Sequence, residues 1–278
     1  MSAAGLLVVL GAGGMGEAIA RRVGPGRTVL LADFNEQLLS RTADAMRGDG
    51  YTVETRVVDV SSRESVRELA QAAAILGPIE ALAHTAGLSP VQAPIDAILR
   101  VDLAGVAFSV DEFAEVIAPG GAGVVIASNA GHQAADGLPS ELQRMLATTA
   151  TDDLLSLPFL AGLTDAGAAY SVAKLANQLR MSAASVVWGA RGARINSVSP
   201  GVISTPMGRA ELEGPHGDFM RAMIDTSGTH RIGTPQDIAA AAEFLLGPAA
   251  SFVTGTDLLV DGGVTGAIRS GALSIPGR

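Results

Sequence analysis

LLVVLGAGGMG, residues 6–16, joins five consecutive apolar residues to a glycine-rich turn. A short apolar run bounded by a turn predicts a buried strand, and residues 16–23 continue as a helix. Glycine lets such a turn fold tightly and lets the backbone approach a pyrophosphate at the free N–H groups of the helix start. A glycine-rich turn alone also arises for structural reasons, but the strand and helix around it favour a dinucleotide site. The expected contact residues are Gly11, Gly13, Gly14, Met15 and Gly16.

The alternation of short apolar runs and longer helix-patterned segments continues along the whole chain. Strands are expected at 6–10, 28–32, 52–58, 79–84, 124–128, 194–198 and 257–260, and helices over 16–23, 35–47, 63–76, 95–118, 169–189 and 235–246. Apolar strands separated by helices predict a parallel sheet covered on both faces, and right-handed crossovers make it doubly wound. No linker or repeat divides the chain. We therefore expect an α/β Rossmann-type fold of about seven strands, with residues 1–278 in one domain.

Composition excludes several classes of protein. The 278-residue chain has a net charge of −9 and no cluster of Lys or Arg, which argues against nucleic acid because phosphate binding needs a basic face. The absence of cysteine excludes a disulfide framework, a thiolate nucleophile and a cysteine-ligated metal, and we expect no metal site. No apolar run is long enough to span a membrane, and Met1–Leu10 lacks the basic segment of a secretory signal. A cytoplasmic protein is therefore expected.

Asp33 closes the second expected strand, 22 residues after Gly11. A carboxylate at this position can accept hydrogen bonds from both hydroxyls of an adenosine ribose, and it would repel a 2′-phosphate. Its neighbours are Ala32 and Phe34, so no arginine stands beside it to receive that phosphate. The pattern favours NAD over NADP and places Phe34 beside the cofactor as well. The alternative is an ordinary aspartate that caps the following helix.

The third and fourth expected strands also end in residues that suit a ligand crevice. Asp59 and Val60 follow the third strand, and Asp59 can either bond the adenine amino group or cap the helix after Ser61. His84 ends the fourth strand and is expected to be a packing histidine with satisfied hydrogen bonds rather than a base. The small residues after it let the backbone lie against the cofactor, which adds Thr85, Ala86 and Gly87 to the expected contacts.

Tyr170 and Lys174 are four residues apart in an expected helix, so both side chains can point into one site. A free tyrosine has a pKa of about 10, and a nearby cation lowers that pKa by favouring the phenolate. Ser128 ends the fifth expected strand, where its hydroxyl can hold a substrate oxygen. A surface Tyr/Lys pair and a turn serine are the alternatives. The three residues together predict an acid/base site, with Ser128 and Tyr170 also in contact with the substrate.

These segments resemble the short-chain dehydrogenase/reductase family over nearly the whole chain. The matching stretches are GAGGMG at 11–16, HTAG at 84–87, IAS at 126–128, YSVAK at 170–174, NSVSPGVIST at 196–205 and the C-terminal stretch 231–263. The resemblance implies reversible hydride transfer between NAD(H) and a secondary alcohol or ketone. It implies that Tyr170 is the acid/base, that Lys174 lowers its pKa and binds the nicotinamide ribose, and that Ser128 orients the substrate.

Further cofactor contacts follow from the same resemblance. Pro200 and Gly201 would line the nicotinamide pocket, while the Ile203 backbone and Thr205 would hold the carboxamide. Asp59 and Val60 would contact adenine, which strengthens that interpretation over helix capping.

The chain departs from the family pattern in three places. Its glycine turn is one residue shorter than the usual T-G-x-x-x-G-x-G. Asp102 stands where the family has an asparagine that supports a water-linked proton relay to the lysine. We expect Asp102 to serve in catalysis, either by holding that water or by lying closer to Lys174. Residues 132–165 form an insertion before the tyrosine, similar to one in some bacterial hydroxysteroid dehydrogenase/carbonyl reductases, and it is either a surface elaboration or a lid or oligomer contact.

Residues 206–232 are expected to close over the substrate, with Met207 in contact with it. An apolar face at helical spacing favours a bulky steroid-like or aromatic alcohol, or else simply packs on the domain, and comprises Leu212, Phe219, Met220, Met223 and Ile224. The resemblance implies a homo-oligomer, a tetramer or dimer. The C-terminal helix and the last strand would form one interface, and the long helices that start near Ile98 and Ala169 would form a second one, which the insertion would block. The alternative functions are a non-catalytic NAD-sensing or scaffold protein and an NAD-dependent epimerase.

Overall fold

The computed structural model describes residues 5–91 and 93–274, and its centre is a sheet of seven parallel strands. The spatial order of the strands is β3-β2-β1-β4-β5-β6-β7. Their bounds are β1 Leu6–Leu10, β2 Thr28–Asp33, β3 Thr52–Val57, β4 Ile79–His84, β5 Ile117–Ile126, β6 Arg194–Pro200 and β7 Asp257–Val260. The chain reverses direction across the sheet between β1 and β4, which confirms the doubly wound α/β fold and creates a ligand crevice at that point.

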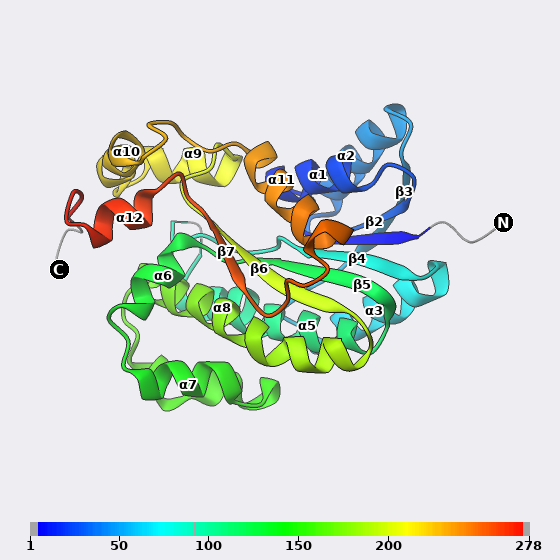
Figure 1. Cartoon of the computed structure of the whole chain (residues 1–278), viewed down its shortest axis with the longest axis horizontal. Coiled ribbons are helices and arrows are strands. Elements are labelled where there is room, and N and C mark those ends of the chain that lie inside the picture. Colours follow the sequence, from blue (N-terminus) through cyan, green and yellow to red (C-terminus); the bar gives the residue numbers. More distant parts are fainter. Residues whose placement is uncertain (1–4, 92, 275–278) are drawn as a thin grey trace.

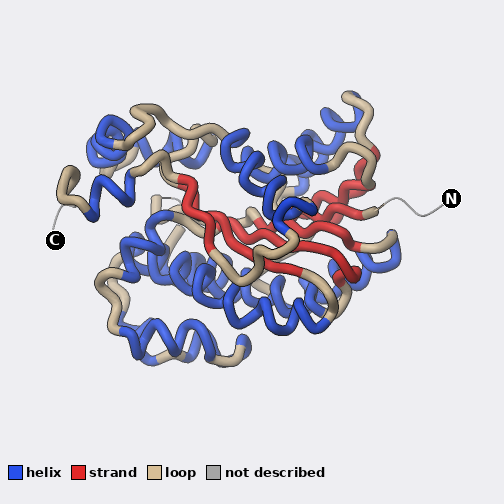
Figure 2. Tube along the Cα trace, in the orientation of Figure 1, coloured by secondary structure: helices blue, strands red, loops and turns tan. Residues whose placement is uncertain are grey.

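Helices cover both faces of the sheet (Figures 1 and 2). One face packs on α1 Gly14–Val23, α2 Glu36–Gly48 and α11 Pro235–Leu246, and the other on α3 Arg63–Leu76, α5 Val106–Ala114 and α8 Ala166–Ala190. Alternate residues of each strand point to opposite faces, so that Leu7 and Val9 pack on one side of β1 and Leu6 and Val8 on the other. Burial on both faces explains why these strands are continuously apolar.

Local capping signals set three of the helix starts as expected. Asn35 accepts a hydrogen bond from the Leu38 N–H at the start of α2, and Ser62 accepts one from Ser65 at the start of α3. Thr234 and Asp237 form a reciprocal capping box at the start of α11. In each case the cap supplies an acceptor for an N–H that has no partner within the helix.

The helix expected over 95–118 is interrupted and shorter. It consists of α4 Ile95–Ile98, a π-helical segment η1 Leu99–Gly105 and α5, and it ends at Ala114. The following residues belong instead to β5, which begins at Ile117 rather than at 124. The pairing of β4 with β5 contains a register irregularity after Ile79, and Gly120 has a φ of 83°. Proline and glycine at 119–121 resemble a turn, but tertiary pairing at Ile117 extends the strand past them.

The insertion folds into three short elements on the outer side of α8 (Figure 1). They are α7 Ser140–Thr148 and the 3₁₀ helices η2 Thr151–Ser156 and η3 Pro158–Gly162, while residues 129–135 before them form α6. Leucines of the insertion pack with residues of η1, α5 and α8, in a cluster that includes Leu146, Leu154, Leu157, Leu160, Leu103, Ala107, Val172 and Ala176. The insertion therefore carries a small apolar core of its own against the domain.

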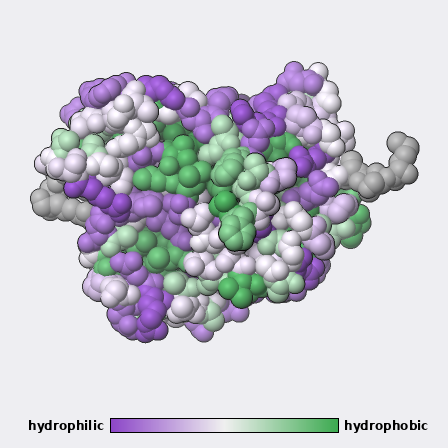
Figure 3. Space-filling model, in the orientation of Figure 1, coloured by the Kyte–Doolittle hydropathy of each residue, from purple (hydrophilic) through white to green (hydrophobic). Residues whose placement is uncertain are grey.

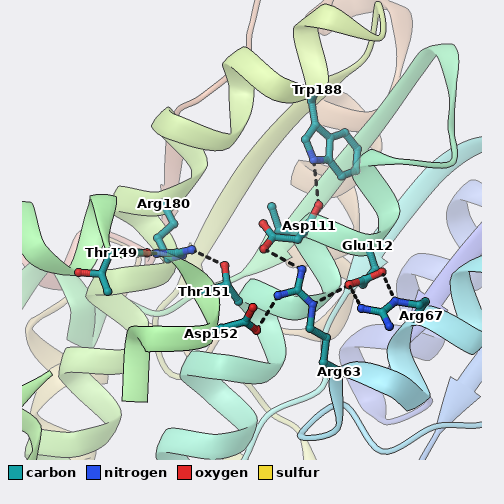
Figure 4. Close-up of polar contacts among 10 residues, drawn as sticks. Arg63, Arg67, Asp111, Glu112, Thr149, Thr151, Asp152, Arg180 and Trp188 are labelled. Atoms are coloured by element: carbon teal, nitrogen blue, oxygen red, sulfur yellow. Dashed lines mark hydrogen bonds and ion pairs between the residues drawn. The ribbon is translucent and has the colours of Figure 1, made fainter. Parts of the chain in front are cut away.

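Two arginines tie the insertion to the helices beneath it (Figure 4). Arg63 of α3 binds Asp152 at 2.7 Å and also Glu112 of α5 at 2.7 Å. Arg180 of α8 donates to the carbonyl of Thr149 and to the hydroxyl of Thr151. These contacts hold η2 in place over α5 and α8.

The segment after β6 forms a separate layer at one end of the sheet (Figure 1). It contains α9 Pro206–Glu213 and α10 Gly217–Thr226, with α12 Val264–Arg269 beside them, while η4 Pro248–Ala250 follows α11. Figure 3 shows hydrophobic side chains in the middle of the viewed face, where β7 and α11 lie. Phe244 and Phe252 are exposed in that part of the chain. No described helix is long and apolar enough to cross a membrane. The prediction that Met1–Leu10 is not a secretory signal falls partly outside the described ranges, which begin at residue 5.

Candidate active site

The glycine-rich turn lies where β1 meets α1, at the carboxyl edge of the sheet. Gly11 has a φ of 98°, and a Cβ there would come within 2.6 Å of the Thr85 Oγ1. A Cβ on Gly16 would come within 1.8 Å of the Gly11 carbonyl oxygen. A Cβ on Gly13 would meet nothing within 4 Å. Packing therefore explains Gly11 and Gly16, whereas Gly13 faces open space beside the helix start, where a pyrophosphate would fit.

Asp33 reaches back from the end of β2 to this turn. Its Oδ2 accepts a hydrogen bond from the Ala12 N–H at 2.7 Å, and its Oδ1 accepts one from Asn35 at 2.8 Å. The helix cap is Asn35, so the capping alternative for Asp33 is wrong. Phe34 beside it is 75% exposed, which leaves an aromatic face free at the position predicted for the adenosine.

Asp59 is not the cap of α3 either, because Ser62 has that role. One carboxylate oxygen of Asp59 accepts hydrogen bonds from the N–H and the hydroxyl of Ser61. This fixes the turn after β3, and Val60 is buried against Gly105 of η1. The position of Asp59 at a strand end is compatible with the predicted adenine contact.

The HTAG segment, residues 84–87 at the end of β4, contacts both the glycine turn and the pair formed by Asp102 and Lys174. Thr85 donates to the carbonyl of Gly11 at 2.9 Å, and the N–H of Ala86 bonds the carbonyl of Leu10, so the segment supports the glycine turn. A Cβ on Gly87 would come within 2.6 Å of the Asp102 Oδ1 and 3.3 Å of the Lys174 Nζ. Gly87 is therefore required by the close approach of that pair.

His84 differs from its expected state. It is fully buried, but neither ring nitrogen has a hydrogen-bond partner among the described residues. Burial, together with the Lys174 charge, lowers the pKa of His84 to about 3. The ring is therefore a neutral packing group as predicted, but its hydrogen bonds are not satisfied as predicted.

Ser128 and Tyr170 line one cavity of about 520 Å³. Ser128 lies just beyond the end of β5 and caps α6 by accepting from the Ala130 N–H at 3.2 Å. Gln178, one turn after Lys174 on α8, holds the Ser128 carbonyl at 2.8 Å and the Ser199 hydroxyl at 2.8 Å. The structure therefore brings the predicted serine and tyrosine together and fixes the serine backbone from α8.

Lys174 lies behind the tyrosine, and its Nζ is 5.4 Å from the centroid of the Tyr170 ring. The ammonium pairs with the Asp102 Oδ1 at 3.0 Å and donates to the Ile126 carbonyl at 3.2 Å. Both charged side chains are buried, at 6% and 0% exposed. Of the two roles left open for Asp102, the geometry favours the direct ion pair. Asp102 also accepts a hydrogen bond from the Leu88 N–H at 3.0 Å.

Burial and charge act against each other on these groups. Burial raises the pKa of the Tyr170 phenol above its ordinary value, although the Lys174 charge opposes this effect. Burial alone would lower the pKa of Lys174, but Asp102 and Tyr170 hold it above its ordinary value. Lys174 is therefore a stable ammonium. Its charge lowers the pKa of Tyr170, which is the predicted direction, but burial outweighs this effect.

The opposite wall of the cavity comes from β6 and the segment that follows it. It contains Pro200, Gly201, Ile203, Thr205 and Met207, with Met15 from the glycine turn. Thr205 caps α9 by accepting from the Gly208 N–H at 3.0 Å. Adenosine-side residues such as Asp33 and Asp59 do not line this cavity but follow neighbouring strands at the same edge of the sheet. The predicted site residues thus lie along one edge of the sheet, and those expected to carry the chemistry line the cavity or lie next to it.

Four polar residues that line the cavity were absent from the sequence prediction of the site: Asn129, Gln133, Asp165 and Glu211. Glu211 lies on α9, in a segment where the sequence prediction named only Met207 and the apolar residues at helical spacing. A carboxylate between apolar helix positions is an ordinary surface pattern, so no sequence signal distinguished it.

Comparison with known proteins gives family matches over two parts of the chain. Residues 6–140 match the family described as short chain dehydrogenase, and residues 156–265 match the one described as enoyl-(acyl carrier protein) reductase. The chain is 44% identical over 258 residues to the short-chain dehydrogenase/reductase bsc3 of Alternaria brassicicola, covering 92% of this chain and 94% of that protein. It is 30% identical over 269 residues to D-threitol dehydrogenase of Mycolicibacterium smegmatis, covering 93% and 92%.

Solved structures share the fold at lower identity. Levodione reductase superposes with a TM-score of 0.76 at 24% identity, over 96% of this chain and all of that chain (100%). A short-chain dehydrogenase/reductase from Serratia marcescens gives a TM-score of 0.73 at 22% identity, over 94% and 98%. At these identities the solved structures show that the chain shares their fold over nearly its whole length.

Proposed function

The chain belongs to the short-chain dehydrogenase/reductase family, and on that premise we propose that it interconverts a secondary alcohol and its ketone with NAD(H). Membership makes it an oxidoreductase that uses a nicotinamide cofactor on a small molecule. The observation that carries the finer proposal is one cavity holding Ser128 and Tyr170, with the Lys174 ammonium behind the phenol.

The residues of the site fit a dinucleotide. The open side of Gly13 leaves room for the pyrophosphate, and the start of α1 offers its free N–H groups. Asp33 would receive the adenosine ribose, with Phe34 and Asp59 nearby. The wall formed by Pro200, Gly201, Ile203 and Thr205 would hold the nicotinamide, while residues 85–87, which follow β4, would support it. When bound, the nicotinamide supplies or accepts the hydride.

Residues of the chain itself would accept and return the proton of the substrate hydroxyl group. In the oxidation direction the alcohol loses its hydroxyl proton to the Tyr170 oxygen as its carbon loses the hydride, and the Ser128 hydroxyl holds the resulting carbonyl oxygen. The fixed charge of Lys174 stabilises the phenolate that must exist before the transfer. Asp102 keeps that lysine charged and in place. In the reduction direction the same phenol returns the proton.

The lining of the cavity favours a substrate whose larger part is apolar. Its inner surface is formed largely by apolar side chains from α9, α10 and the loop after β4, including Val91, Met207, Phe219, Met220 and Met223. A volume of about 520 Å³ lies within the range of small-molecule sites. We propose a cyclic or aromatic alcohol or ketone, since such bodies fill an apolar pocket with little polar surface to desolvate.

Replacement of the tyrosine tests the reaction. Tyr170→Phe removes the proton donor and leaves the ring, so turnover should fall by about 10²–10⁴-fold or more. NADH binding, followed by fluorescence titration, should change little. Formation of NADH at 340 nm from a panel of secondary alcohols is the activity measurement. Turnover in the variant equal to wild type would overturn the proposal, and NADH binding by wild type without turnover of any alcohol would favour a non-catalytic NAD-sensing role.

Cofactor choice provides the second test. The Asp33 carboxylate should repel the 2′-phosphate of NADP, so kcat/KM should favour NAD by about a hundredfold. Asp33→Asn keeps an acceptor for the Ala12 N–H but removes the charge. The ratio of kcat/KM with NAD to kcat/KM with NADP should therefore be lower in this variant. Glu36→Gln removes an exposed carboxylate nearby and serves as the control. A wild-type preference for NADP, or an unchanged ratio in Asp33→Asn, would show that Asp33 does not select the cofactor.

A further inference from the structure

Glu211 places a carboxylate in the wall of the cavity, on the side where apolar residues of α9 and α10 also line it. It lies on α9 and lines the same cavity as Ser128 and Tyr170. The other acidic residue of the lining is Asp165, whose carboxylate already accepts from the Ala168 N–H at 2.8 Å to cap α8. No Lys or Arg is present among the lining residues. The cavity therefore offers two acidic groups and no permanent cation to a ligand.

The Glu211 carboxylate has no ionic partner within the described ranges. Its surroundings desolvate it, which raises the pKa of Glu211, and the buried Ser89 hydroxyl acts in the opposite direction by favouring the ionised form. A carboxyl group in such a pocket loses hydration without a compensating charge. A hydrogen-bond donor brought by the ligand would give the carboxylate a second partner beside the Ser89 hydroxyl.

Glu211 also acts on the reacting tyrosine. Its negative charge is close enough to raise the pKa of Tyr170, so it opposes the phenolate that alcohol oxidation requires. A donor that binds the carboxylate would reduce this repulsion at the moment when the substrate is in place. Glu211 and Tyr170 line the same cavity, so a donor that binds the carboxylate would share that cavity with the carbon that reacts.

We propose that Glu211 is a specificity-determining residue that accepts a hydrogen bond from a second polar group, a hydroxyl or an ammonium, near the reacting carbon of the substrate. The inference rests on the proposed alcohol–ketone interconversion. The preferred substrates are then apolar-bodied diols, hydroxyketones or amino alcohols. Substrates with a carboxylate near the reacting carbon are disfavoured, because Glu211 would repel them.

Four matched probes test this assignment: cyclohexanol, trans-1,2-cyclohexanediol, trans-2-aminocyclohexanol and trans-2-hydroxycyclohexanecarboxylate. The measurement is kcat/KM for NADH formation with wild type, Glu211→Gln and Glu211→Leu. Glu213→Gln, an exposed residue of the same helix, is the control variant. Wild type should prefer the diol or the amino alcohol to cyclohexanol by about tenfold or more, and the hydroxy acid should be the poorest probe.

The variants distinguish the two donors. If the donor is an ammonium, Glu211→Gln should lose most of the preference for the amino alcohol, because the charge is gone. If it is a hydroxyl, Glu211→Gln should keep part of the preference for the diol, because its amide oxygen still accepts. Glu211→Leu should lose either preference, so that kcat/KM for the diol and the amino alcohol falls to the level of cyclohexanol. Unchanged ratios of kcat/KM among the four probes would overturn the inference.

A binding measurement tests the role of Glu211 independently of the proposed reaction. Isothermal titration calorimetry of the four probes with NAD-loaded Tyr170→Phe and Tyr170→Phe/Glu211→Leu does not depend on turnover. Donor-selective binding that Glu211→Leu abolishes would support the inference even if wild type oxidises none of the probes, in which case the proposed reaction fails alone. Absence of any donor selectivity in binding and in turnover would reject the role of Glu211.

Discussion

At the scale of single residues, the proposed chemistry depends on a buried ion pair. Lys174 and Asp102 lie 3.0 Å apart with almost no exposure to solvent. Removing two charges from water is costly, and the pair is tolerable because Ile126 and Leu88 supply further hydrogen bonds to it. The direct pairing keeps the ammonium charged and facing the tyrosine. An asparagine at position 102 could accept from the lysine but could not neutralise it.

Asp102 variants should therefore lose stability in a graded way. Asp102→Ala leaves a buried ammonium without its counter-charge and should lower the free energy of unfolding by about 3–5 kcal/mol. Asp102→Asn keeps the shape and one acceptor oxygen, so its loss should be smaller. Urea unfolding followed by circular dichroism gives the values. Asp153→Ala, at an exposed carboxylate of η2, should stay within about 0.5 kcal/mol of wild type, and an Asp102→Ala protein as stable as that control would contradict the account.

At the scale of elements, short local signals place helices that then carry site residues. The π-helical segment η1 turns Asp102 toward Lys174, and π-helical turns often occur at functional sites. The capping box at Thr234 starts α11, which packs against α1 beneath the glycine turn. Arg231 adds an ion pair to Asp237, and these contacts hold the pKa of Asp237 far below its usual range.

Removal of the α11 cap gives a prediction at this scale. Thr234→Ala loses the acceptor for the Asp237 N–H and should reduce the free energy of unfolding by about 1 kcal/mol. Thr234→Ser keeps the hydroxyl and should remain within a few tenths of wild type. Chemical unfolding of the three proteins side by side is the measurement. Equal losses in the alanine and serine variants would show that the hydroxyl is not the source of the stability.

At the scale of the whole molecule, the insertion changes which surfaces remain open. It covers one part of α8 and of η1, whereas Val186 and Val187 near the end of α8 stay exposed. The face of β7 and α11, with Phe244 and Phe252, is also open. Self-association as a dimer or tetramer stays a prediction. In the monomer the insertion buries leucines against helices that bear the tyrosine and lysine, so it stabilises the chemical end.

The acid stability of the whole fold should depend on His84. Its folded-state pKa of about 3 lies below the unfolded value of about 6.5, so below pH 6.5 the unfolded chain binds a proton that the folded protein does not. Stability contributed by the neutral ring is therefore present above about pH 6.5 and declines as the pH falls toward 3. Between pH 7.5 and 5.0 this amounts to about 2 kcal/mol.

His84→Asn tests this pH dependence. The fall in the free energy of unfolding between pH 7.5 and 5.0 should shrink in the variant, whatever its stability at neutral pH. His216→Asn, at an exposed histidine, should leave the fall unchanged. The same fall in His84→Asn as in wild type would mean that other groups cause the acid sensitivity.

Several features could be predicted because their cause is local. A run such as Leu6–Leu10 is apolar because both faces of its strand are buried, and the caps at Asn35, Ser62 and Thr234 act within a single helical turn. The early start of β5 could not be predicted, because pairing with Ile79 on a neighbouring strand sets it against the turn signals of its own residues.

Residue type, period and short spacing were enough to predict the doubly wound sheet, the glycine turn with Asp33, and the combination of Ser128, Tyr170 and Lys174 that resembles the family pattern. The fold was needed to show that Asp102 pairs directly with Lys174, that His84 is buried without a hydrogen-bond partner among the described residues, and that Glu211 lines the cavity of the tyrosine. These three features depend on how residues from different elements pack around one another, and such packing has no periodic signature in the sequence.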